Sequence, residues 1–176
     1  MKEMSRVASN HRADLPLPEW LDKNGVVAID GVDTRQLTKI TRESGSLRCL
    51  ISTIDSDHDS LVAKARALSA TDGRDLASVV TCDKPYEWKE RYPESYPNLI
   101  EEVGGDPLRV VCYDFGAKRN ILRNLHSVGF DVRVLPATTD LDTLMSSSPD
   151  AVFLTNGPGD PAAVTYGVDL VKGILE

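Results

Sequence analysis

The chain has 176 residues, a net charge of −7 and a pI near 5.0. A chain of this length buries roughly 70% of its unfolded surface, which suits one full domain or two small ones. Charged residues make up 27% and hydrophobic residues 41%, a composition that excludes wholesale disorder. The negative balance argues against binding to nucleic acid or to an acidic membrane, because both need a basic face.

The sequence predicts neither membrane insertion nor export. No apolar run approaches the roughly 18–20 residues that a spanning helix needs, and the N-terminal stretch lacks the apolar centre of a secretory signal. The three cysteines, Cys49, Cys82 and Cys112, are widely spaced and form no CxxC pair. Because such spacing fits reduced thiols, we expect a cytoplasmic protein.

The first 82 residues predict a domain of mixed short helices and strands. Gly25 and Gly45 are placed to end helices, and Asp33 is placed to cap the start of one. Leu47, Cys49 and Ile51 alternate as in a strand. The predicted elements are a helix at 18–24, a strand at 26–29, a helix from Asp33 to Gly45, a strand at 47–51 and a helix at 59–69.

Residues 83–107 predict an interdomain linker. They hold four of the ten prolines, the pair Gly104-Gly105, and no sustained helical or strand period. We interpret the aromatic residues of this segment as packing it onto the flanking domains rather than binding a ligand. They are Tyr86, Trp88, Tyr92 and Tyr96.

Residues 108–176 predict an α/β domain with a doubly wound, flavodoxin-like parallel sheet. Three apolar strands, at 110–113, 131–135 and 151–155, alternate with helices. The helices are expected at 117–128, from Thr139, and after the loop 156–161. The last helix should turn Val164, Val168, Val171, Ile174 and Leu175 inward. Three strands are few for such a sheet, so we expect a domain that is cut short.

The loop Asn156–Pro161, NGPGDP, follows the third strand, where ligands bind in doubly wound folds. Gly157 and Gly159 allow a ligand to approach the main chain, and N–H groups in such a turn can hold an oxyanion or a carboxylate. The same residue types also form an ordinary strand-to-helix turn, so that alternative stays open. The loop lacks the Lys-Ser/Thr of a phosphate-binding P-loop.

The loop after the first strand, DFGAKRN, offers a second candidate. Asp114 could cap the following helix, whereas Lys118 and Arg119 lie in its first turn, where the helix dipole disfavours cations. That misfit suggests a salt bridge to another element, although plain surface charges are the alternative. The DFG triplet is no kinase signature, because no Gly-rich loop, HRD or VAIK motif accompanies it.

No residue of the chain stands out as a nucleophile or a metal ligand. Cys112 lies within a strand, where a buried thiol is expected, and the sequence has no GxCxG elbow. His126 has no thiol to pair with. His58 lies in the polar stretch DSDHDS, and a zinc site would need clustered ligands, so we expect no metal.

These motifs together resemble one family. VVCYDFGAKRNILRNL and LTNGPGDPA resemble the opening of the class I, triad-type glutamine amidotransferase domain of the carbamoyl-phosphate synthetase small chain. GVDTRQLTKITRESGSL resembles the end of the mixed β/α N-terminal domain of that subunit. The resemblance runs from about Ala8 to Glu176, and DFGAKRNILR and DTRQLTKITRESG are its most specific parts.

The resemblance implies a glutaminase subunit. In the family a cysteine, activated by a His–Glu pair, hydrolyses glutamine to glutamate and ammonia. The ammonia passes to a large synthetase subunit that uses ATP and Mg²⁺, so no cofactor is expected in this chain. The two loop glycines contact glutamine in the family and correspond to Gly157 and Gly159, with the Gly157 N–H as oxyanion donor. The family serves arginine and pyrimidine biosynthesis.

The resemblance also implies a partial chain, cut at both ends. The GxCxGHQ elbow and the His–Glu pair would follow Glu176, and a glutamine-contacting serine would precede Met1. We therefore expect no catalytic residue here and no activity from this chain alone. The alternatives are a non-catalytic fragment that docks on the large subunit, another triad amidotransferase such as the anthranilate or GMP branch, and a flavodoxin-like binding module. The DTRQLTKITRESG segment speaks against the second of these.

Overall fold

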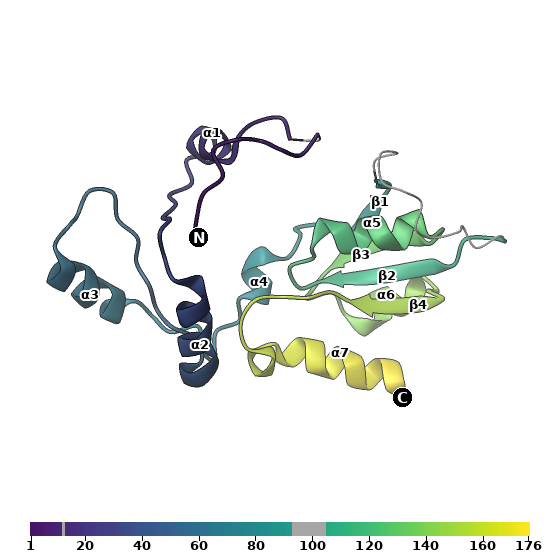
Figure 1. Ribbon diagram of the computed structural model, residues 1–176. Helices are drawn as coiled ribbons and strands as arrows, with labels where there is room; N and C mark the ends of the chain where they lie inside the picture. The colour runs from purple at the N-terminus through teal and green to yellow at the C-terminus, as the bar shows by residue number, and fades with distance from the viewer. Residues whose placement is uncertain (12, 93–104) are drawn as a thin grey trace. The chain divides into compact units, whose positions relative to one another are not determined.

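The computed structural model describes residues 1–11, 13–92 and 105–176, which form two compact units, Met1–Ala70 and Thr71–Glu176. The first unit holds three helices, α1 (Leu17–Lys23), α2 (Thr34–Ser44) and α3 (His58–Ala67). The second unit holds the sheet and the remaining helices (Figure 1). Among the described residues no helix has the length and apolar character that crossing a membrane requires.

Capping residues mark the starts of α2 and α3 and the end of α2. The Asp33 carboxylate accepts a hydrogen bond from the Gln36 N–H at 3.0 Å and caps α2. Gly45 ends α2 with a φ of +76°, a conformation that glycine adopts without strain. The Asp57 carboxylate caps α3 by accepting from the Asp59 N–H at 3.0 Å. The three predicted helices of this region are thus confirmed.

The two strands predicted in the first unit, at 26–29 and 47–51, are wrong. Neither segment forms a ladder with a second strand among the described residues, and both leave their apolar side chains exposed. A strand is stable only when a neighbour takes up its N–H and C=O groups, and alternation along the chain cannot supply that neighbour. Instead, the Ile29 carbonyl accepts from the N-terminal ammonium at 2.8 Å.

The second unit is built on a four-stranded mixed sheet in the order β1-β3-β2-β4. The parallel strands β2 (Arg109–Asp114), β3 (Asp131–Pro136) and β4 (Ala151–Leu154) match the three predicted strands. The fourth strand, β1 (Tyr86–Trp88), pairs antiparallel with β3. The helices are α4 (Ala77–Val80), α5 (Arg119–Ser127), α6 (Leu141–Ser146), the 3₁₀ turn η1 (Pro161–Ala163) and α7 (Thr165–Leu175). The α/β class is confirmed.

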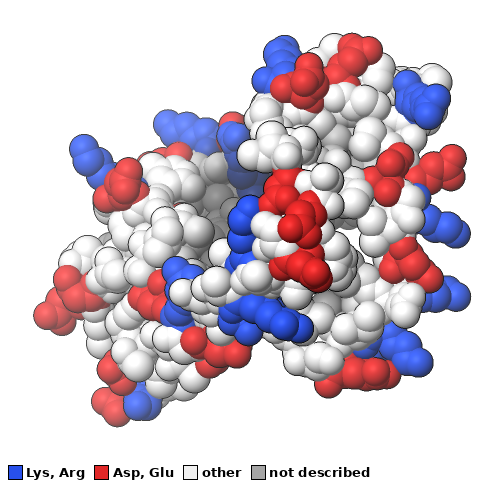
Figure 2. Space-filling model, turned by 90° about the vertical axis from the view of Figure 1, so that its left-hand side faces the viewer, with Lys and Arg blue, Asp and Glu red and all other residues white. Residues whose placement is uncertain are grey.

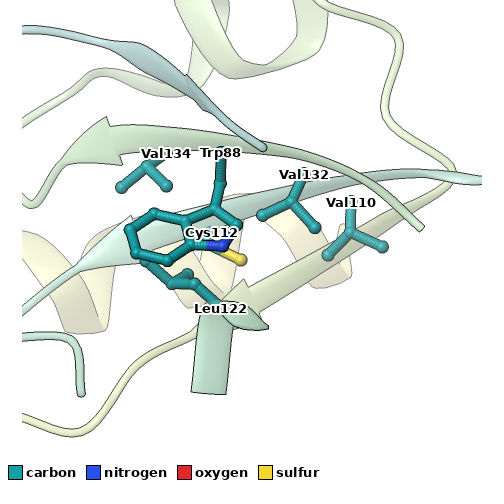
Figure 3. Close-up of a cluster of buried hydrophobic side chains, with 6 residues drawn as sticks. All are labelled: Trp88, Val110, Cys112, Leu122, Val132 and Val134. Atoms are coloured by element: carbon teal, nitrogen blue, oxygen red, sulfur yellow. The ribbon is translucent and has the colours of Figure 1, made fainter. Parts of the chain in front are cut away.

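Helices cover both faces of this sheet (Figure 1). On one face α5 presses Leu122 into a buried cluster (Figure 3). The other members of the cluster are Trp88, Val110, Cys112, Val132 and Val134. On the opposite face Leu144 of α6 and Leu170 of α7 pack on Val111, Tyr113 and Leu135. Alternate side chains of β2 thus enter two cores, as expected of a strand buried on both sides.

Strand β1 lies within the segment 83–107 that the sequence predicts to be a linker, so the beginning of that segment is part of the sheet. The second unit starts earlier still, at Thr71, whereas the sequence predicts a boundary after Cys82. A three-residue strand is too short to show a period, which is why no pattern revealed it. Residues 93–104 of the predicted linker, Tyr96 included, lie outside the described residues.

Helix α7 packs through only part of the predicted face, since Val164, Val171 and Ile174 are half-buried as predicted and Val168 and Leu175 are not. Gly167 and Leu170 are buried, and Ile174 packs beside them, whereas Val168 is 47% exposed and Leu175 is 82% exposed. Gly167 permits this close packing, because a Cβ at that position would lie 3.2 Å from the Phe115 ring. A count of apolar residues favours the valine-rich face, and glycine carries no hydrophobic signal that would correct it.

Candidate functional site

The two candidate loops meet at the carboxyl ends of β2 and β4. The Thr155 hydroxyl accepts from the Phe115 N–H at 3.0 Å. The side-chain oxygen of Asn156 accepts from the Lys118 N–H at 3.3 Å, and its amide nitrogen donates to the Gly116 carbonyl at 3.2 Å. Three hydrogen bonds therefore join two loops about forty residues apart in sequence, at the edge where α/β sheets bind ligands.

Both glycines of the turn are required by the local backbone. A Cβ on Gly157 would lie 2.5 Å from the Phe115 carbonyl oxygen, a distance that no side chain tolerates. Gly159 has a φ of +84°, in the left-handed region that disfavours other residues. Asp160 then begins η1 by accepting from the Ala162 N–H at 2.9 Å. The turn is consequently bare of side chains at its two glycines and fixed at both ends.

The N–H groups of Gly157 and Gly159 donate no hydrogen bond to any described residue. Both glycines line a hollow of about 410 Å³ between the turn and α7. The other walls of the hollow are mainly apolar, with Phe115, Leu154 and Val168 among them. The arrangement places two glycines, whose N–H groups bond to no described residue, in the lining of an apolar space, and such donors are what a ligand carbonyl or an oxyanion would need.

Asp114 has a different role from the predicted one. The first residue before α5 is Lys118, which makes no side-chain cap, so Asp114 does not cap that helix. Its buried carboxylate accepts from the N–H groups of Gly116 at 3.0 Å and Ala117 at 2.7 Å. Its second oxygen accepts from the Cys82 N–H at 2.9 Å. Asp114 therefore holds the first loop and the segment before β1 together.

The salt bridge suggested for the two misplaced cations is present for Arg119, whereas Lys118 forms no ion pair with a described residue. The Glu90 carboxylate contacts Arg119 and Arg123, with an N–O distance of 2.9 Å in each pair. The Arg119 guanidinium also lies 5.7 Å from the centre of the Trp88 ring, within range of a cation–π contact. Acidic and basic side chains are likewise interspersed on the face shown in Figure 2.

The thiols of the second unit are poor nucleophiles. Burial raises the pKa of Cys112 to about 12, and the side chain has no exposed surface. Burial, followed by the negative charge of Asp114, raises the pKa of Cys82 to about 11. Since the thiolate is the reactive form, neither thiol is activated at neutral pH. Cys49 is exposed in the first unit.

The histidines are dispersed as the sequence predicts. His126 lies with its Nδ1 3.1 Å from the Phe130 carbonyl, and His58 lies exposed, 3.6 Å from Asp59. Within residues 1–11, 13–92 and 105–176, no group of three potential metal-ligating side chains comes together.

The sequence does not predict one part of the site. The segment 74–82, which the sequence assigns to the first domain, packs against the glycine turn, with the Arg74 carbonyl oxygen and Leu76 each 3.4 Å from where a Cβ of Gly159 would lie. The only signal for it was local: Asp75 stands three residues before Ser78, as a capping aspartate does.

Known proteins match both parts of the chain. Residues 1–51 match the family model of the carbamoyl-phosphate synthase small chain, CPSase domain, and residues 111–176 match that of the class-I glutamine amidotransferases. A carbamoyl phosphate synthase small chain from Syntrophotalea carbinolica is 43% identical over 175 residues, which cover 99% of this chain and 46% of the relative.

Two further relatives carry the same description. The protein from Thermosynechococcus vestitus is 44% identical over 172 residues, which cover 96% of this chain and 44% of the relative. The protein from Pseudomonas putida is 40% identical over 181 residues, which cover 100% of this chain and 47% of the relative. The chain therefore spans about half the length of the curated relatives that it matches.

Proposed function

Because the chain belongs to the carbamoyl-phosphate synthase small chain family, we propose that it forms part of a glutamine amidotransferase subunit and binds the side-chain amide of L-glutamine at Gly157 and Gly159. The observation that carries this proposal is that Gly157 and Gly159, whose N–H groups donate to none of the described residues, both line the hollow beside α7. The whole subunit would hydrolyse glutamine and pass the ammonia to a large synthetase subunit.

The chemistry assigned to the turn is oxyanion stabilisation. When a nucleophile attacks the amide carbon of glutamine, the carbonyl oxygen gains negative charge, and a preorganised N–H donor then binds it more strongly than it binds the substrate. The packing of Gly157 on the Phe115 carbonyl and the bridge made by Asn156 supply that preorganisation. One such donor is typically worth about 10²–10³ in rate. The Gly157 N–H is the donor that we assign.

The proposal assigns binding to this chain and bond breaking to other residues of the subunit. The raised pKa of Cys112 and of Cys82 leaves almost no thiolate at neutral pH, and neither lines the hollow. We therefore expect no ammonia release from glutamine by the 176-residue chain. No cofactor is assigned to it, since ATP and Mg²⁺ act in the large subunit. We also propose that the subunit is cytoplasmic and that it acts in arginine or pyrimidine synthesis.

The test follows the amide resonances of Gly157 and Gly159 while L-glutamine is added to the chain. Both should shift in a saturable way, and L-asparagine, one methylene shorter, should shift them less. An ammonia assay on the same sample should give no turnover above background. Unchanged glycine resonances at millimolar glutamine would refute the binding assignment, and turnover would refute the division of roles.

A second candidate function is docking of the first unit on the large subunit without catalysis. None of the described residues of this unit is buried, and it exposes apolar side chains such as Val27, Ile51 and Ile54. An apolar surface of this kind suits a protein interface. Substituting Ile54, which is 98% exposed, with Asp should weaken binding to a purified large subunit and leave the glycine resonances unchanged. Unaltered binding would exclude this surface from the interface.

A further inference from the structure

The segment Arg74–Cys82 crosses the carboxyl ends of the parallel strands, and the proposed function uses none of its residues. Its last part is tied to the ends of two strands. The Cys82 N–H donates to Asp114 at the end of β2, at 2.9 Å. The Thr81 hydroxyl accepts from the N–H of Ala137, just after β3, at 2.8 Å. These bonds hold the segment against the edge of the sheet where the loops begin.

The middle of the segment packs on both loops. Val80 lies 3.0 Å from where a Cβ of Gly116 would be, so it closes one side of the loop after β2. Leu76 and the Arg74 carbonyl oxygen each lie 3.4 Å from the corresponding position on Gly159. The left-handed backbone of Gly159 therefore rests on this segment and has little room to move toward it.

A series of half-buried and exposed contacts connects the segment to the other glycine. The Tyr166 hydroxyl, from the start of α7, donates to Asp75 at 3.2 Å, and the same carboxylate accepts from the Ser78 N–H at 3.0 Å. The Tyr166 ring stacks on Phe115, with 6.5 Å between ring centres. The Phe115 carbonyl is the group against which Gly157 packs. Contacts thus run from Asp75 through Tyr166 and Phe115 to the turn.

We propose that residues 74–82 act as a positioning element, in which Asp75 and Tyr166 set the orientation of the Gly157 and Gly159 N–H groups without touching the ligand. The identity of that ligand as glutamine rests on the proposed function. Asp75 and Tyr166 are positioning residues. Loss of one such hydrogen bond should lower glutamine affinity by about three- to tenfold, because a typical net hydrogen bond is worth that factor.

Two variants of the 176-residue chain test the element. Tyr166→Phe removes a single hydroxyl and keeps the ring stacked on Phe115. The Gly157 and Gly159 resonances should move, and hydrogen exchange of the Phe115 and Lys118 N–H groups, which donate to Thr155 and Asn156 at the turn, should accelerate several-fold, while the resonances of β2 and β3 stay in place. Tyr86→Phe, a matched change on β1, should leave the turn unaltered. If Tyr166→Phe leaves both the glycine resonances and these exchange rates unchanged, the proposal is wrong.

The carboxylate gives a second test with its own rescue. Asp75→Ala should reproduce the effect of Tyr166→Phe, whereas Asp75→Asn keeps an oxygen that can accept both hydrogen bonds and should restore the turn. If Ala and Asn behaved alike, whether both disturbed the turn or neither did, the hydrogen bonds accepted by Asp75 would not position the turn, and that result would overturn the assignment. If the wild-type chain binds no glutamine, the proposed function is refuted. The exchange rates in the variants would still test whether residues 74–82 position the turn. If Asp75→Ala unfolds, the single-hydroxyl variant decides.

Discussion

The two units of this chain are stabilised in opposite ways. In the unit Thr71–Glu176 the strand β2 sends alternate side chains into two cores, and six large side chains besides Cys112 are almost completely enclosed. In the unit Met1–Ala70 none of the described residues is buried, and α2 and α3 begin with exposed side-chain caps. The comparison indicates that the packed core of the second unit can hold a turn in one conformation. The apolar side chains of the first unit would need additional contacts to become buried.

The largest expected difference between the units comes from truncating a leucine in each. Leu144→Ala removes a fully buried side chain under the sheet and should cost about 2–5 kcal/mol in the free energy of unfolding of the second unit. Leu37→Ala removes a half-exposed side chain of α2 and should change stability by about 0.5 kcal/mol or less. Urea denaturation, followed by Trp88 fluorescence in a Trp20→Phe background, measures the first effect, and the circular dichroism of the helices measures the second. Equal losses would contradict the comparison.

The second-largest expected effect comes from replacing a glycine by alanine in each unit. Gly157 is needed because a neighbouring carbonyl lies close to it, and Gly31 is favoured because its φ is positive. Gly157→Ala forces a methyl group against the Phe115 carbonyl and should cost about 1–3 kcal/mol, as overpacking does, and should abolish the glutamine-induced shifts. Gly31→Ala in the first unit meets no neighbouring atom and suffers only from its φ of +75°. It should leave the glutamine response intact. A normal glutamine response in Gly157→Ala would remove the turn from the site.

A pH titration should show how much Asp55 stabilises the first unit. Hydrogen bonds from Lys64, Ser60 and the Asp57 N–H lower the pKa of Asp55 to about 2 from its usual 3.8. Because the folded pKa is depressed, the contribution of Asp55 is fully present above pH 3.8 and is lost as the pH falls toward 2. Circular dichroism at 222 nm should fall over this range, and Asp55→Asn should remove that part of the pH dependence. An identical titration in the variant would exclude Asp55 as its source.

The smallest expected effect concerns the surface ion pairs of the second unit. Glu90→Gln breaks the contacts with Arg119 and Arg123, all of which are at least partly exposed, and should cost about 1 kcal/mol or less. The loss should shrink further in 0.5 M NaCl, because salt screens exposed charges. Unfolding at low and high salt checks this, with Glu87→Gln on β1 as a comparison. A loss that does not depend on salt would assign the effect of Glu90 to packing instead.

The sequence was most informative where burial on both faces leaves an unmistakable pattern. Strands 110–113, 131–135 and 151–155 were found because each is an apolar run between turn residues. The helix that follows Asp33 was found because a cap and a terminal glycine bracket it. These patterns are local, so they can be recognised without knowing which other segments pack against them.

The errors arose where the decisive contact is distant. Segments 26–29 and 47–51 have strand character but pair with no other strand in the described part of the chain. The role of Asp114 depends on the Cys82 N–H, which lies 32 residues away, and the packed face of α7 depends on Phe115 meeting Gly167. The glycine turn was found as a loop, but the reason for Gly157, a carbonyl from another loop, could not be read from the turn itself.

The position of β1 has a consequence for the order in which the chain folds. Tyr86–Trp88 precede β2 in the sequence, yet they hydrogen-bond to β3. Tyr86 therefore cannot pair until Val134 has been synthesised and β3 has formed. During synthesis this short strand stays unpaired until both parallel strands have emerged, and closing so long a loop is slow compared with forming α5. We expect Trp88 to be among the last side chains to become enclosed, so its fluorescence should report completion of the sheet rather than its nucleation.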